Sequence, residues 1–169
     1  MRRWCECGYD RGVNASDFVD RMMGLHAQLD DRFFAHQQAL LDRDFARAAA
    51  ALADYRDRLW RHIQDEESQV LPRYAALGGE VGDAPVRLFL GEHRNLRTFV
   101  DDFDVRLARL VQQPDDRPLL ELFDRQATFK NLLLHHDLRE RNALYPFLAE
   151  HLPAAEQERV LAALSWSGG

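Results

Sequence analysis

A histidine and a glutamate occur four residues apart at two places in the chain, each time in the same local setting. The first copy consists of Leu59, His62, Glu66 and Pro72, and the second of Leu133, His136, Glu140 and Pro146. All offsets agree, so the second copy is the first displaced by 74 positions. Residues four apart lie on one face of an α-helix, so each copy places an imidazole beside a carboxylate. Such ligands suit a first-row metal, and carboxylates can bridge two metal ions.

The surrounding sequence predicts four long amphipathic helices and a short fifth one. Apolar residues recur every three or four positions, which is the period of a helix with one buried face. Glycine and proline residues between these stretches mark turns. We expect helices at about 14–41, 45–77, 85–111, 119–152 and 153–164. Pro72 should kink the second helix or end it early, because proline lacks an N–H group and its ring clashes with the preceding turn.

Short connections between long helices make neighbouring helices antiparallel. The predicted fold is therefore all-α, an up-down-up-down four-helix bundle with a short C-terminal helix. We expect one four-helix bundle domain at 14–165 and an irregular, flexible N-terminal tail at 1–13. A chain of 169 residues can bury a substantial core as a single domain.

Composition narrows the classes of function. The formal charge is −6, and the arginines alternate with acidic residues instead of forming a basic run, so we predict no nucleic-acid partner. No apolar run is long enough to span a membrane, and the first residues are charged, so we predict neither membrane insertion nor export but a cytoplasmic location. The only cysteines, Cys5 and Cys7, are interpreted as oxidisable tail residues, because no further cysteine completes a zinc site.

The predicted helices bring further polar residues to the level of the repeated motif. Counted from a turn near residue 43, His26 comes 17 residues earlier and His62 comes 19 residues later, so the two lie at nearly the same height. The same count from the later turns adds His93. Buried imidazoles and carboxylates without a compensating cation are costly, which favours a metal site over a structural polar network. The predicted ligands are His26, His62, Glu66, His93, His136 and Glu140.

The other histidines fall outside this set. His36 is ten residues, or about 15 Å, from His26 along the helix and is expected to be a partly buried packing residue. His151 lies past the last proline of the motif and is expected at the surface. His135 points about 100° away from His136 on the helix and is kept as the second choice for the ligand on the fourth helix.

These motifs resemble the hemerythrin-like (HHE) cation-binding domain family over about residues 19–150. The matching pieces are His26, the pair in "HIQDEESQVLP", His93 in "LGEHRNL" and the pair in "HDLRERNALYP". The resemblance implies two non-haem iron ions, bridged by the two glutamates and by an oxo or hydroxo group. Ferritin-like proteins usually carry Glu-x-x-His, acid first, so the order His-x-x-x-Glu argues against that family.

Two positions depart from the pattern of the oxygen-binding hemerythrins. Those proteins have a second histidine four residues after the histidine of the third helix, where this chain has Arg97. Asp30, one turn after His26, or a water molecule is the candidate replacement. Hemerythrins also often place the acid of the fourth helix five residues after its histidine, and by that spacing His135 would pair with Glu140.

The resemblance implies binding of dioxygen or a related small oxidant, such as nitric oxide or peroxide, for storage, sensing or delivery. The coordination position left open at Arg97 gives one alternative, a di-iron oxidase or peroxidase. An iron or redox sensor is a further alternative, because the energy of metal binding in a bundle is also folding energy. The sequence indicates no separate substrate pocket, and no general acid or base outside the ligand set. We therefore favour a protein that is not an enzyme.

Overall fold

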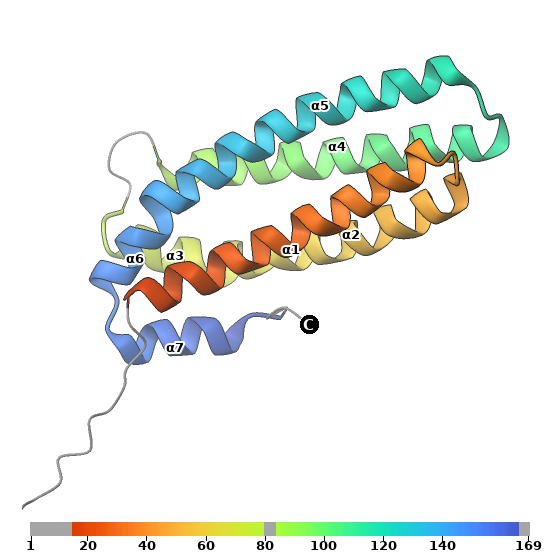
Figure 1. Ribbon diagram of the computed structural model, residues 1–169. Coiled ribbons are helices and arrows are strands. Elements are labelled where there is room, and N and C mark those ends of the chain that lie inside the picture. Colours follow the sequence, from red (N-terminus) through yellow and green to blue (C-terminus); the bar gives the residue numbers. More distant parts are fainter. Residues whose placement is uncertain (1–14, 80–83, 166–169) are drawn as a thin grey trace, which may run out of the picture.

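The computed structural model describes residues 15–79 and 84–165, and within these ranges it consists of helices and connections without strands (Figure 1). The predicted tail at 1–13, with Cys5 and Cys7, lies outside the described residues. The helices are α1 (Ala15–Leu41), α2 (Phe45–Asp65), α3 (Leu71–Ala76), α4 (Val86–Gln112), α5 (Asp116–Arg139), α6 (Tyr145–His151) and α7 (Ala154–Ala163). The all-α prediction is confirmed.

Four long helical segments form the up-down-up-down bundle that the sequence predicts. The helix α1 lies beside α2, and α4 lies beside α5, so the chain forms two helical hairpins that pack against each other (Figure 1). The segments α2 with α3 and α5 with α6 are the second member of each hairpin. The short C-terminal helix is also confirmed, because α7 turns back and lies against α1.

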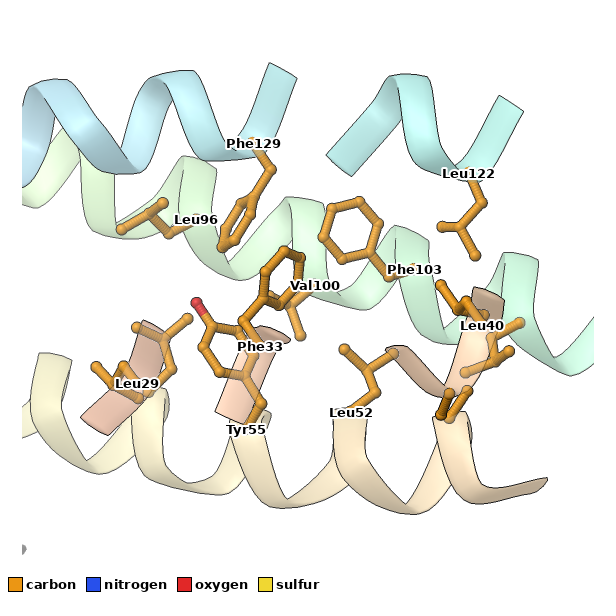
Figure 2. Packing of buried hydrophobic residues seen from close by; sticks show 14 of the residues in the cluster. Leu29, Phe33, Leu40, Leu52, Tyr55, Leu96, Val100, Phe103, Leu122 and Phe129 are labelled. Carbon is orange, nitrogen blue, oxygen red and sulfur yellow. The ribbon is translucent and has the colours of Figure 1, made fainter. Parts of the chain in front are cut away.

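Two apolar clusters fill the bundle, one towards each end. The larger cluster contains Phe33, Tyr55, Phe103 and Phe129, one from each long helix, whose side chains point toward one another (Figure 2). The ring centroids of Phe33 and Tyr55 are 5.0 Å apart, and those of Phe33 and Phe129 are 5.2 Å apart. The second cluster includes Met22, Val70, Phe89 and Leu148. The predicted metal ligands lie near the boundary between these two clusters.

A π-helical turn lies within each copy of the repeated motif, between its glutamate and its proline. The turns span Glu66–Val70 and Glu140–Leu144, and each begins at the glutamate. The N–H group of Leu71 donates to the carbonyl of Glu66, five residues earlier, and the N–H group of Tyr145 donates to the carbonyl of Glu140. This wider turn accommodates the prolines, which have no N–H group to donate. The second segment therefore stays helical to Ala76 and does not end at Pro72.

The extra residue in each π turn shifts the buried face of the helix by one position. An uninterrupted period predicts that Phe147 points inward, but it is only half-buried. Tyr145 and Leu148 are fully buried in its place. In the second segment Val70, and not Gln69, is the buried residue. The π turns thus bring a tyrosine into the interior that the period of a regular helix does not place there.

Phe33 offers a test of the larger cluster, since its neighbour in the sequence is a matched control. Phe33 is 3 % exposed and contacts the buried rings of Tyr55, Phe103 and Phe129, whereas Phe34 is 59 % exposed. Phe33→Ala should lower the free energy of unfolding of the metal-free protein in urea by about 3–5 kcal/mol. Phe34→Ala should change it by less than about 0.5 kcal/mol. Equal losses for the two variants would contradict this description of the core.

Candidate metal centre

The structure brings all six predicted ligands together in the middle of the bundle. They form two groups of four, and within each group one possible ligand atom of every residue lies within 4.8 Å of the others. The first group is His26, His62, Glu66 and Glu140, and the second is Glu66, His93, His136 and Glu140. All six side chains are buried. The first group takes both histidines from the first hairpin, and the second group takes both from the second hairpin.

Glu66 faces one histidine of each group. Its Oε2 atom lies 3.7 Å from His62 Nε2 and 3.2 Å from His93 Nε2. These two histidines come from different hairpins, α2 and α4. One carboxylate is therefore shared by both groups, as a bridging ligand requires.

Glu140 has the corresponding position on the opposite hairpin. Its Oε2 atom lies 3.4 Å from His26 Nε2, and its Oε1 atom lies 3.0 Å from His136 Nε2. The two oxygens of one carboxylate thus face different groups. Together, the two glutamates place two shared carboxylates between four imidazoles, which is a donor set for two cations.

Several polar atoms at this centre have no hydrogen-bond partner. Among the described residues, these buried atoms include Glu66 Oε2, His93 Nε2 and both carboxylate oxygens of Glu140. Buried polar groups are normally hydrogen-bonded, because leaving water without a new partner costs free energy. Coordination of a cation would compensate these atoms. The arrangement therefore fits a metal centre better than a self-contained polar network.

Three of the four histidines direct Nδ1, the other ring nitrogen, to a carboxylate outside the two groups. Each pair has a separation of 3.1 Å, and the pairs are His26–Asp137, His93–Glu67 and His136–Glu92. An Nδ1–H group that donates to a carboxylate fixes the ring and leaves Nε2 for a metal. Sequence reasoning missed these three acids, although each is the direct neighbour in the sequence of a predicted ligand.

Tyr145 is a further residue of the centre that sequence reasoning missed. Its hydroxyl donates a short hydrogen bond to Glu66 Oε1 and lies 3.2 Å from His26 Nε2. The side chain is fully buried, and burial together with the nearby charges of Glu140 and Glu66 holds its pKa well above the usual value. The phenol therefore keeps its proton at neutral pH.

Burial and proximity give the groups of the centre very different proton affinities. Burial lowers the pKa of His62 to about 4, against the opposing effect of the Glu66 charge. Burial acts in the same direction on His136, but the negative charge of the nearby Glu140 carboxylate outweighs it and raises the pKa of His136 to about 9. Burial and the charge of Glu66 raise the pKa of Glu140. Without metal, the centre holds protons that a cation must displace.

The structure also places the residues that the sequence argument set aside. His36 is far from the centre and fully buried, more so than expected. Its Nδ1–H group donates to the carbonyl of Ala48 at 2.8 Å, and the amide of Gln126 donates to Nε2 at 2.9 Å. Both ring nitrogens are therefore occupied. Burial lowers the pKa of His36, consistent with a neutral ring.

The remaining alternatives lie outside both groups. His135 is exposed, whereas its neighbour His136 is buried within the second group. His151 is exposed and stacks on Phe147, with 4.1 Å between the ring centroids. Asp30 belongs to neither group, although it lines a small cavity beside the centre. The geometry thus favours His136 over His135.

Comparison with models of known protein families matches residues 17–148 to the hemerythrin HHE cation-binding domain. The match spans all six predicted ligands and most of the chain. Searches of curated proteins and of solved structures gave no match. Among the described residues, no helix is both long enough and apolar enough to cross a membrane.

The neighbouring histidines of α5 provide a direct test of the centre. His136→Ala removes a buried member of the second group, so it should lower the amount of Co²⁺ bound per chain. His135→Ala removes an exposed ring and should leave the bound Co²⁺ unchanged. Metal analysis after gel filtration measures both variants. Loss of metal from the His135 variant alone would show that the pairing of ligands on α5 is wrong.

The raised pKa of His136 predicts how metal binding depends on pH. At neutral pH this ring is protonated, because its pKa is about 9, and only the neutral ring binds a metal. The affinity for Co²⁺ should therefore rise about tenfold per pH unit for each proton displaced. Titration against a competing chelator at several pH values between neutrality and pH 9 measures this slope.

The stability of the metal-free protein should change with pH in the opposite direction to the metal affinity. The charged His136 contributes stability that is fully present below the ordinary pKa of 6.5 and is lost as the pH rises through about 9. Thermal unfolding without metal should thus show decreasing stability over the range in which metal affinity increases. An affinity for Co²⁺ that does not vary between neutral pH and about pH 9 would contradict this assignment of the His136 proton.

Proposed function

Because the chain belongs to the hemerythrin HHE cation-binding domain family, we propose that it binds two non-haem iron ions and, through them, a small oxidant. The oxidant would be dioxygen, nitric oxide or peroxide, held for storage, sensing or delivery. The observation that carries the proposal is the sharing of Glu66 and Glu140 by two groups of four ligands. Two shared carboxylates support a pair of neighbouring ions, with an oxo or hydroxo bridge completing the centre.

The donor set supports iron. It combines neutral imidazoles with carboxylates, which suits iron and other borderline first-row ions and contains none of the thiolates that softer ions prefer. Bound iron would supply the electrons that an oxidant accepts. The carboxylates of Asp137, Glu67 and Glu92 orient the histidine rings through their Nδ1 atoms. The apolar clusters on both sides exclude water from the centre.

A small cavity beside the first group supports a small ligand. Its lining includes His26, His62 and His136 together with leucine, isoleucine and aspartate side chains, and its volume is about 10 Å³. That is roughly the space needed by one water molecule. Asp30, Leu133 and Asp137 line both this cavity and a larger surface cavity of about 380 Å³. A cavity of this size beside the centre suits a small ligand better than a bulky substrate.

Each group offers four protein ligands, so coordination positions remain for water or an oxidant. Arg97 makes no contact with the six ligand side chains among the described interactions and pairs with Glu67 instead. Asp30 lies outside both groups, which supports water over Asp30 as the replacement for the missing histidine. A cytoplasmic location and the absence of a nucleic-acid partner remain predictions from the sequence.

A di-iron oxidase or peroxidase is the second candidate, and Tyr145 is the observation that favours it. Reduction of an oxidant consumes protons, and the Tyr145 hydroxyl is a buried proton donor hydrogen-bonded to Glu66. Sequence reasoning found no general acid outside the ligand set. The structure therefore gives this alternative more support than the sequence alone did.

The proposal predicts two iron ions per chain. Protein loaded with ferrous iron without oxygen and then exposed to air should contain about two ions per chain and show the charge-transfer bands of an oxo-bridged pair. Glu66→Gln should lower the iron content sharply, because it weakens a ligand shared by both groups. A content clearly below two ions with no such bands would refute the di-iron centre.

Removal of oxygen then separates a carrier from an enzyme. A carrier should regain the spectrum of the reduced protein without added reductant when oxygen is pumped away. An oxidase or peroxidase should instead stay oxidised and consume hydrogen peroxide over many cycles. In that case Tyr145→Phe, which keeps the ring and removes the proton donor, should slow consumption while the iron content is retained.

A further inference from the structure

Arg97 takes part in a chain of contacts that ends at a predicted ligand. Its Nη2 atom lies 3.6 Å from Glu67 Oε2, and Glu67 Oε1 accepts a hydrogen bond of 3.1 Å from His93 Nδ1. The opposite ring atom, His93 Nε2, faces Glu66 at the centre. Arg97, which occupies the position of the missing histidine ligand, is thus connected to His93 through the carboxylate of Glu67.

Arg139 makes the same kind of chain to the other histidine of the second group. Its guanidinium forms a close ion pair with Glu92, and its Nε atom lies 3.3 Å from Glu92 Oε2. The same Oε2 atom accepts a hydrogen bond of 3.1 Å from His136 Nδ1. Glu92 is only 5 % exposed, so its charge needs a nearby cation when His136 is neutral.

The first group lacks this arrangement. His26 Nδ1 also has a carboxylate partner, Asp137, but no arginine pairs with Asp137 in the part of the chain that the structure describes. Asp137 also lines the cavities on that side of the centre. The two groups therefore share their bridging carboxylates but differ in what supports their histidines.

We propose that Arg97 and Arg139 are positioning residues for one of the two metal positions, the one held by His93 and His136. Each arginine fixes a carboxylate, and the carboxylate fixes the Nδ1–H group so that Nε2 points at the metal. The inference rests on the proposed metal centre. It adds that the two positions are supported independently and can be weakened one at a time.

Variants that keep only one of the two ligand groups complete make the inference testable. His62→Ala leaves the second group complete, and His93→Ala leaves the first group complete. The probe is Co²⁺, whose affinity is measured by competition with a chelator in each background. Arg139→Met should lower the affinity about tenfold in the His62→Ala background and by less than about twofold in the His93→Ala background. Arg97→Met should act in the same direction but more weakly, because its contact is longer and more exposed.

Neighbouring arginines and a conservative variant serve as controls. Arg141→Met lies on the same segment at an exposed position and should leave the affinity unchanged in both backgrounds, and Arg94→Met is the corresponding control for Arg97. Arg139→Lys keeps a positive charge near Glu92 and should restore part of the affinity. If the His62→Ala or His93→Ala chain does not fold, Arg139→Met is introduced into the otherwise unchanged chain. Titration of that variant with Co²⁺ should then show one of two binding steps weakened.

The outcomes separate this inference from the proposed function. Equal losses in both backgrounds, or no loss in either, would overturn the positioning role while leaving the metal centre intact. A fall in the melting temperature of the metal-free Arg139→Met protein with both binding steps weakened would assign the arginine a general structural role and also overturn it. Failure of the unaltered chain to bind Co²⁺ or iron would overturn the proposed function itself, and the inference with it.

Discussion

The rest of the bundle must compensate two carboxylates that are buried opposite each other. Glu66 and Glu140 are fully buried, and the charge of the first raises the pKa of the second. Like charges in an apolar interior are unfavourable unless cations or hydrogen-bond donors surround them. Four imidazoles and the hydroxyl of Tyr145 face this pair, and apolar clusters close both ends. The long helices supply the rigid positions that this arrangement requires.

The bundle and its six polar residues were predictable because both follow from the helical period. Apolar residues at every third or fourth position define one buried face, and turns fix where each helix starts. The common height of His26 and His62 then follows from counting residues at a constant rise. The same counting excluded His36, which the structure places in a separate network with Ala48 and Gln126.

The parts that sequence reasoning missed depend on a break in the period or on contacts between helices. The π turns insert a residue after Glu66 and Glu140, so every later side chain is rotated, and Tyr145 points inward. Glu67, Glu92 and Asp137 reach histidines on neighbouring helices. A helical wheel describes one helix at a time and cannot show such partners. The proline in each copy of the motif was the available signal for the π turns, but Pro72 was interpreted as a kink or an end of the second helix.

The distribution of ligands between the hairpins gives the molecule an approximate internal twofold symmetry. Each of the two groups of four takes two histidines from one hairpin and one carboxylate from each of the two hairpins. Neither half of the chain can therefore assemble a complete group alone. A bound cation would join the two hairpins much as an interfacial ion joins two subunits, so the free energy of cation binding would also stabilise the association of the half-bundles.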